Sequence, residues 1–141
     1  MRVFWLWLLV ACAAPKPVAP GPTTVYAQLE ASADLAGTPI GHVDEPTLVI
    51  VFASWCPHCK EELAVLQTLH DVRILAVNYR GHEEYDHRGS SAAVKAFAEA
   101  HPWLRVVPID DALFAALGSP AKIPSIYIID RGGTLTHSYA R

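Results

Sequence analysis

Residues 49–60 read VIVFASWCPHCK, and this stretch decides the fold. Its first half belongs to a continuous run of β-branched, aliphatic and aromatic residues, 47–53, which is too short for a typical helix. A run of this kind predicts a strand that is buried on both faces of a sheet. The turn-like residues that follow it carry two cysteines, so the chemistry of this chain is expected where the strand ends.

The next segment, residues 57–70, has the spacing of an amphipathic helix. Its leucines recur about one turn apart, and polar residues are available for the solvent side: Leu63, Leu66 and Leu69 on one face, Lys60, Glu61 and Gln67 on the other. Cys56 and Cys59 therefore lie where a buried strand gives way to a helix.

This position suits sulfur chemistry. Unpaired backbone N–H groups and the positive end of the helix dipole favour a thiolate over a thiol, so we expect Cys56 to be the attacking sulfur. Cys59 follows nearly one helical turn later, which permits a Cys56–Cys59 disulfide and makes Cys59 the expected resolving thiol. Pro57 suits the first helical turn, because its missing N–H has no intrahelical partner there.

Other interpretations of these residues stay open. His58 either stabilises the thiolate of Cys56 as a neighbouring partial cation or is simply an exposed side chain. The cysteine pair is alternatively a static disulfide, or two ligands of a zinc site that would need two more ligands. The sequence has three cysteines in all, and its other histidines are scattered. We therefore expect no metal and no cofactor.

Further strands and helices alternate along the rest of the chain. We expect strands at 72–77, 106–109 and 125–130, and helices at 91–101 and 110–117. Two glycines in the turn at 131–133 predict a hairpin with a last strand at 134–139. The expected fold class is α/β, a central mixed sheet flanked by helices with a C-terminal β-hairpin.

Two segments have weaker patterns. Residues 26–43 contain short apolar pieces separated by Gly37, Pro39 and Gly41, and we expect an additional hairpin there. Residues 79–89 are rich in histidine and acidic side chains. A solvated loop is the expectation for them, and a substrate-facing or metal-binding loop is the alternative.

The chain opens with Arg2 and an apolar run that is too short to span a bilayer, which needs about 20 residues. We expect residues 1–11 to be a cleaved signal peptide. The residues Leu9-Val10-Ala11-Cys12 resemble the lipobox of bacterial lipoproteins, which implies lipidation of Cys12. Lipidation would also leave one cysteine pair in the exported protein, where an odd thiol is unfavourable. The alternative is a free cysteine within an ordinary signal peptide.

Residues 12–22 contain four prolines among small residues, which predicts an extended tether behind the anchor. Such a stretch reaches on the order of 30 Å. Residues 23–141 are long enough for one domain. The sequence has 11 basic residues against 14 acidic ones, with no basic stripe, so we expect no nucleic-acid partner.

From about Tyr26 to Tyr139 the chain resembles the thioredoxin superfamily, particularly the membrane-anchored TlpA-like thiol-disulfide oxidoreductases. Residues 49–60 resemble the strand and active site of that family. Lys122-Ile123-Pro124-Ser125, followed by the predicted strand and Gly132-Gly133, resembles its cis-proline segment. Two motifs in the expected order are more specific than one.

The resemblance implies a cis bond before Pro124, facing the two cysteines, and an Ile123 backbone that is offered to a substrate chain. Trp55, Pro57 and Ile123 would then surround the active site. Glu62 lies where anchored relatives have an acidic group, so it is a candidate proton acceptor, or else a solvated helix carboxylate. The sequence also departs from its relatives.

Ile50 stands where thioredoxin has a buried aspartate, so the handling of protons cannot be copied from that protein. No final helix is expected after the hairpin. We expect the sheet face that such a helix covers to be covered by residues 26–43, by a partner or by self-association.

The family implies a catalyst of disulfide exchange on exported proteins that bear thiols or disulfides. We expect a reductant, since anchored relatives often keep cytochrome c or metal-site cysteines reduced, and a membrane redox partner to supply its electrons. The Pro57-His58 pair argues instead for an oxidant, because the oxidant DsbA has the same pair. A copper-binding delivery module is a further alternative. A thiol peroxidase is a third, but the sequence before Cys56 lacks the threonine-containing approach of that family.

The expected place is the bacterial cell envelope, as a lipoprotein facing the periplasm. Ala13 does not resemble an inner-membrane retention signal, so the outer membrane is favoured.

Overall fold

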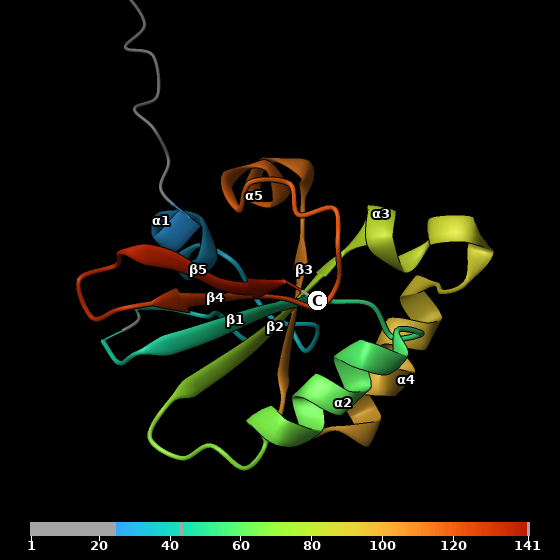
Figure 1. Cartoon of the computed structure of the whole chain (residues 1–141), viewed down its shortest axis with the longest axis horizontal. Helices are drawn as coiled ribbons and strands as arrows, with labels where there is room; N and C mark the ends of the chain where they lie inside the picture. The colour runs from blue at the N-terminus through green and yellow to red at the C-terminus, as the bar shows by residue number, and fades with distance from the viewer. Residues whose placement is uncertain (1–24, 43, 141) are drawn as a thin grey trace, which may run out of the picture.

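The computed structural model describes residues 25–42 and 44–140. It has one five-stranded mixed sheet in the order β3-β2-β1-β4-β5, with helices on both faces (Figure 1). This confirms the expected fold class. The predicted signal peptide, Cys12 and all of the proline-rich tether, residues 12–22, lie outside the described residues.

Three parallel strands form one half of the sheet. β1 (Thr47–Phe52) is its centre, β2 (Arg73–Tyr79) lies beside it, and β3 (Arg105–Ile109) is the edge. Every residue of β1 is buried, as the continuous apolar run predicted. Because both faces of β1 are covered, its end is a rigid support for the turn that carries the cysteines.

The predicted hairpin completes the sheet. β4 (Ser125–Ile129) pairs antiparallel with β1, and β5 (Leu135–Ala140) pairs antiparallel with β4. The turn between them is held by the carboxylate of Asp130, which accepts hydrogen bonds from the amides of Gly132 and Thr134, both at 2.9 Å.

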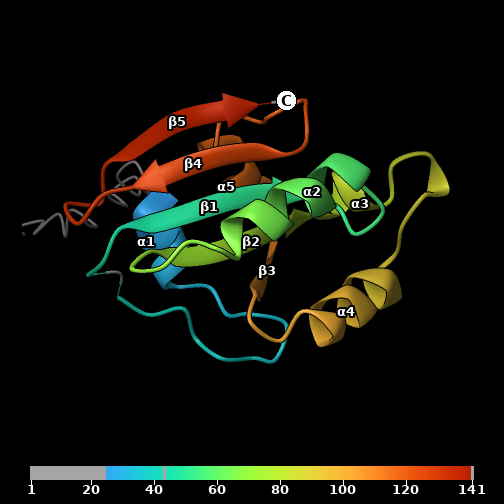
Figure 2. The ribbon, with the colours of Figure 1, turned by 60° about the horizontal axis from the view of Figure 1, so that its bottom comes forward.

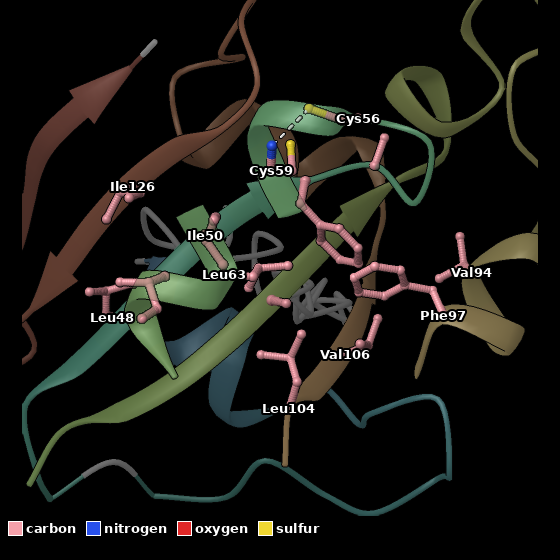
Figure 3. Close-up of a cluster of buried hydrophobic side chains, with 14 residues drawn as sticks. Leu48, Ile50, Cys56, Cys59, Leu63, Val94, Phe97, Leu104, Val106 and Ile126 are labelled. Carbon is pink, nitrogen blue, oxygen red and sulfur yellow. Dashed lines mark hydrogen bonds between the residues drawn. The ribbon is translucent and has the colours of Figure 1, made fainter. Parts of the chain in front are cut away.

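Two helices cover one sheet face. α2 (Pro57–Leu66) and α4 (Ser91–Ala100) pack over side chains such as Ile50 and Phe52 (Figure 3). Leu63 and Leu66 are buried as predicted. Leu69 is 44% exposed, because the helix ends at Leu66 and the chain continues in tight turns.

The opposite face is covered by α1 (Val25–Glu30) and α5 (Asp111–Ala116) (Figure 1). The hairpin predicted for residues 26–43 is wrong for their first part, which is helical, and is found only as a minimal antiparallel turn with a single bridge between Ala33 and Pro39. Val25, Leu29 and Ile40 are buried against the sheet. Of the three coverings expected for that face, the N-terminal segment is the one observed.

An ion pair fixes this N-terminal segment to the edge strand. The guanidinium of Arg105 donates to one carboxylate oxygen of Asp34 at 3.1 and 3.0 Å, and to the carbonyls of Thr38 and Pro39. The amide of Leu35 donates to the carbonyl of Val106 at 2.9 Å. In Figure 2 the segment after α1, drawn in blue to cyan, passes below the sheet as a strap that turns back along itself.

Residues 79–89 are more ordered than a solvated loop. They form a short helix, α3 (Arg80–Glu83), and a single 3-10 turn, Tyr85–His87. Tyr85 is 63% exposed, as expected for a loop, whereas Glu83 is 2% exposed. The expectation of a solvated loop is thus wrong for Glu83, whose side chain points into the protein.

Candidate active site

Cys56 caps the start of α2. Its backbone is extended, its amide donates to the carbonyl of Ala53, and its sulfur accepts a hydrogen bond from the amide of Cys59 at 3.2 Å (Figure 3). Pro57 is the first residue of the helix. The sulfur thus occupies the place of a capping oxygen, where a helix presents unpaired N–H groups.

Cys56 and Cys59 are free thiols. Both are buried, Cys56 at 3% exposure and Cys59 at 0%. Their side chains lie together at the start of α2, in the buried cluster that also contains Leu63 (Figure 3). Burial, together with the neighbouring Cys56 sulfur, raises the pKa of Cys59 well above its usual range. Cys59 therefore remains a thiol until a base removes its proton.

The second motif comes to the same place. The Ile123–Pro124 peptide bond is cis, as the resemblance implied, and the Cys56 thiol lies 3.9 Å from the carbonyl oxygen of Ile123. The hydroxyl of Ser125 donates to the carbonyl of Lys122 at 2.7 Å, which holds this loop. Pro124 is buried and Ile123 is partly buried.

His58 and Glu62 lie on α2 without touching the sulfurs. His58 is exposed, and its Nδ1 lies 3.3 Å from the Glu61 carboxylate. Glu62 is partly exposed. Among the described residues, neither side chain forms a hydrogen bond or ion pair with Cys56 or Cys59. Their catalytic roles stay predictions.

Trp55 lies against the residues that follow β2. Its indole N–H donates to the carbonyls of Glu83 at 2.9 Å and His82 at 3.2 Å, and the guanidinium of Arg88 lies 5.0 Å from the centre of its ring. The carboxylate of Glu83 binds Ser54 directly. Sequence reasoning missed Glu83, because a glutamate in a run of charged residues has the pattern of a surface loop.

Within residues 25–42 and 44–140, no three or more histidine, cysteine or acidic side chains come together in an arrangement that would hold a metal ion. In the same ranges, no helix has the length and apolar character needed to cross a bilayer.

No described protein family's sequence profile matches the chain. The chain does match one characterised protein in sequence. It is 31% identical over 96 residues to the thiol:disulfide interchange protein DsbE of Pseudomonas aeruginosa, a match that covers 66% of this chain and 49% of that protein. The fold agrees with that of the N-terminal domain of PilB from Neisseria gonorrhoeae, with a TM-score of 0.61 at 23% identity, covering 79% of this chain and 80% of that one.

The chain has a thioredoxin-like fold.

A second solved structure of similar fold, StoA from Bacillus subtilis, has a TM-score of 0.61 at 19% identity, covering 77% of this chain and 84% of that one. The exposed lipoprotein thioredoxin Etrx1 of Streptococcus pneumoniae has a TM-score of 0.60 at 18% identity, covering 78% and 87%. At these identities the likeness concerns the fold. The chain spans about half the length of its DsbE relative.

Ile50, the position at which the sequence departs from thioredoxin, lies in the core beside the cysteines. Ile50 is fully buried, in the same cluster as Cys59 and Leu63 (Figure 3). An apolar side chain at this place takes up no proton from Cys59, so the base for that thiol has to come from elsewhere.

Proposed function

We propose that this protein is a thiol-disulfide oxidoreductase that acts on exported proteins, with Cys56 as the attacking sulfur and Cys59 as the resolving one. One observation carries the proposal. The free thiol of Cys56 caps α2, with the free thiol of Cys59 in the first turn of the same helix, and Cys56 faces the carbonyl of Ile123 beside Pro124. Two motifs far apart in sequence thus meet at one reactive sulfur.

The reaction has two exchange steps. The Cys56 thiolate attacks one sulfur of a substrate disulfide, which forms a mixed disulfide and releases the other substrate sulfur as a thiolate. Cys59 then loses its proton and attacks the Cys56 sulfur, which frees the second substrate thiol. The substrate gains two electrons and two protons, and the protein ends with a Cys56–Cys59 disulfide.

The Cys59 amide assists the first step. It donates to the Cys56 sulfur at 3.2 Å, and a hydrogen bond to an anion is stronger than one to a neutral acceptor. The raised pKa of Cys59 keeps the second sulfur protonated while Cys56 reacts. The pair therefore reacts in a fixed order.

We further propose that the protein works as a reductant, with substrates such as cytochrome c or metal-site cysteines and a membrane redox partner that restores its thiols. The main argument for an oxidant is a His58 that stabilises the Cys56 thiolate. His58 instead lies beside the Glu61 carboxylate, which offsets its charge when it is protonated. This contact supports the reducing direction.

Reduction of insulin disulfides by dithiothreitol tests the activity. The wild-type domain should accelerate the reaction, and Cys56→Ser should abolish the acceleration. The reduction potential, measured against glutathione, decides the direction: a value near −270 mV supports a reductant, whereas one near −120 mV supports an oxidant. A wild-type domain with no effect on insulin, with or without glutathione, would overturn the proposal.

We also propose that the protein is a periplasm-facing lipoprotein of the outer membrane, anchored through Cys12. Two acyl chains hold a protein stably on a membrane, at about 0.8 kcal/mol per buried methylene. Mass spectrometry of the mature N-terminus should find diacylglycerol on Cys12, and Cys12→Ser should move the protein from the outer-membrane fraction to the soluble one. Cys59→Ser is the matched control. Equal fractionation of all three proteins would contradict the anchor.

A further inference from the structure

Glu83 is an unusual residue of this fold. Among residues 25–42, 44–136 and 139–140 it is the only acidic or basic residue that is buried, at 2% exposure. A buried carboxylate is costly unless hydrogen bonds compensate for the water that it has lost. Glu83 lies at the end of α3, outside both motifs of the redox site, so its burial calls for a role.

Three donors converge on the Glu83 carboxylate. The Ser54 amide donates at 2.8 Å, the Ser54 hydroxyl at 2.5 Å, and the Asn78 side-chain amide at 2.9 Å. Asn78 also donates to the carbonyl of Phe52 at 3.2 Å. Because all three partners donate, the site fits a carboxylate, which only accepts. Its contacts join the ends of β1 and β2 to the turn before the cysteines.

The next residue of that turn is held by the same short helix. The indole N–H of Trp55 donates to the backbone carbonyls of His82 and Glu83. Ser54 and Trp55, the two residues directly before Cys56, are therefore both bound to the end of α3. Among the described residues, no hydrogen bond joins the side chain of Ser54 or Trp55 to any other helix.

Gly89 completes the enclosure. A Cβ built on Gly89 would overlap the Glu83 carboxylate and would lie 2.6 Å from the Glu83 carbonyl. The backbone at this position thus lies directly against the carboxylate, and only a residue without a side chain fits. The returning loop seals Glu83 from water.

We propose that Glu83 is a positioning residue for the redox site: its carboxylate fixes the Ser54–Trp55 turn, so that the Cys56 sulfur stays at the capping position of α2. The importance of this role for catalysis rests on the proposed thiol-disulfide activity. The geometry of the turn can be tested without that activity, because the reactivity of Cys56 towards a simple alkylating agent reports it directly.

The experiment measures the rate of Cys56 alkylation by iodoacetamide as a function of pH. Glu83→Gln keeps the size of the side chain but places an amide NH₂ group against donors. The loss of one charge-assisted hydrogen bond corresponds to about a tenfold effect. We expect alkylation at pH 7 to slow about tenfold and the profile to move to higher pH, because a looser turn gives up the contact with the Cys59 amide.

A second variant separates geometry from charge. Ser54→Ala removes one donor from the turn and leaves the Glu83 carboxylate in place. Positioning predicts that both variants move the profile in the same direction. If Glu83→Gln instead moves it to lower pH while Ser54→Ala has no effect, the carboxylate acts only as a nearby negative charge, and the proposal is wrong.

Glu84→Gln is the matched control, because Glu84 is an exposed neighbour paired with Arg80 at 2.9 Å, and its profile should equal that of the wild type. The other titratable or charged groups about this turn are Cys59, His58, His82 and Arg88, and they are the same in every variant. Should Glu83→Gln fail to fold, Ser54→Ala still decides, since an unchanged profile in a folded Ser54→Ala protein would overturn the proposal.

The outcomes also separate this proposal from the proposed function. A wild-type protein that alkylates rapidly at Cys56 but does not reduce insulin would reject the function and leave the role of Glu83 testable. A protein that reduces insulin equally well with Glu83→Gln, with an unchanged alkylation profile, would reject the role of Glu83 alone.

Discussion

The thiol of Cys56 lies 3.9 Å from the carbonyl oxygen of Ile123, although 67 positions separate the two residues. The antiparallel register of β1 and β4 produces this contact, since it pairs Val51 with Ser125 close to both motifs. A shift of one residue between these strands would turn every side chain of β4 to the other face. The redox site therefore depends on a register that the buried faces of the sheet enforce.

The two thiols should differ in reactivity. Burial and the neighbouring sulfur raise the pKa of Cys59, so at neutral pH it is protonated and Cys56 is the sulfur that reacts. Limiting iodoacetamide should label Cys56 first in the native reduced protein, and peptide mass spectrometry reads the site. In denaturant both cysteines should be labelled equally. Equal labelling of the native protein would contradict the assigned order.

Glu62 should accelerate the resolving step if it accepts the proton of Cys59. Glu62→Gln is then expected to slow the decay of the mixed disulfide by about 100-fold at neutral pH, the lower end of the range for a general base, with less effect on its formation. Rapid-quench trapping of the mixed disulfide separates the two steps. Glu99→Gln, on the exposed side of α4, should decay at the wild-type rate. Equal decay in both variants would remove Glu62 from the mechanism.

Leu63, within α2, and Leu69, beyond the end of that helix, should have very different effects on stability. Leu63 is 2% exposed, and Leu63→Ala should lower the free energy of unfolding by about 2–5 kcal/mol through lost burial and a cavity. Leu69 is 44% exposed, and Leu69→Ala should change it by no more than about 0.5 kcal/mol. Urea unfolding measures both. Similar losses would mean that α2 continues past Leu66 and buries Leu69.

Arg105 should stabilise the N-terminal segment. Arg105→Met leaves the Asp34 carboxylate without its cationic partner and should cost about 1–3 kcal/mol, the range for removing one partner of a hydrogen bond. Arg80→Met breaks an exposed pair with Glu84 and should cost less than about 1 kcal/mol. Thermal unfolding at neutral pH compares the two variants. An Arg105→Met protein as stable as Arg80→Met would show that the ion pair contributes little.

Acid should weaken the ion pair between Asp34 and Arg105. Burial alone would raise the pKa of Asp34, but hydrogen bonds from the Thr38 amide and from Arg105 outweigh it, and the pKa is lowered. A lowered carboxyl pKa gives stability that is present above the unfolded value of 3.8 and is lost as the pH falls through the folded value. The difference in stability between wild type and Asp34→Asn should therefore shrink below about pH 4.

His82 should make the protein less stable in mild acid. Burial lowers its pKa, and a backbone hydrogen bond with Pro120 offsets only part of that shift. Below the unfolded value of 6.5 the unfolded chain binds a proton that the folded ring resists, so stability falls as the pH decreases from 7.5 to 5.5.

His82→Phe keeps the edge-on packing against Tyr79 and Phe114 and should lose less stability over this range. His58→Gln, at an exposed position, should follow the wild-type curve. A His82→Phe protein with wild-type pH dependence would contradict the assignment.

The central part of the fold could be predicted from the sequence because its signals are local. A continuous apolar run specifies β1, and the periodic leucines specify α2. The paired glycines after Asp130 specify the hairpin. The place of Cys56 at the start of a helix follows directly from these elements, and so does the approach of Cys59 from the first turn of the same helix.

The rest depends on contacts between distant residues. The helix α1 was missed because Gly37 and Pro39 suggested turns, while the burial of Leu29 comes only from the sheet beneath it. Glu83 was missed because its neighbours in sequence are charged, whereas its partners Ser54 and Asn78 come from the ends of two strands. No local pattern contains that information.

The hydrogen bond from the Leu35 amide to the Val106 carbonyl should affect how readily the protein aggregates. An outer strand with unsatisfied backbone groups is a template for pairing with another molecule, and aggregation often begins there. Here the strap held by Arg105 occupies part of the β3 edge and blocks such pairing on that side. A chain in which this segment detaches would expose an unpaired, aggregation-prone edge of its sheet while the core is still folded.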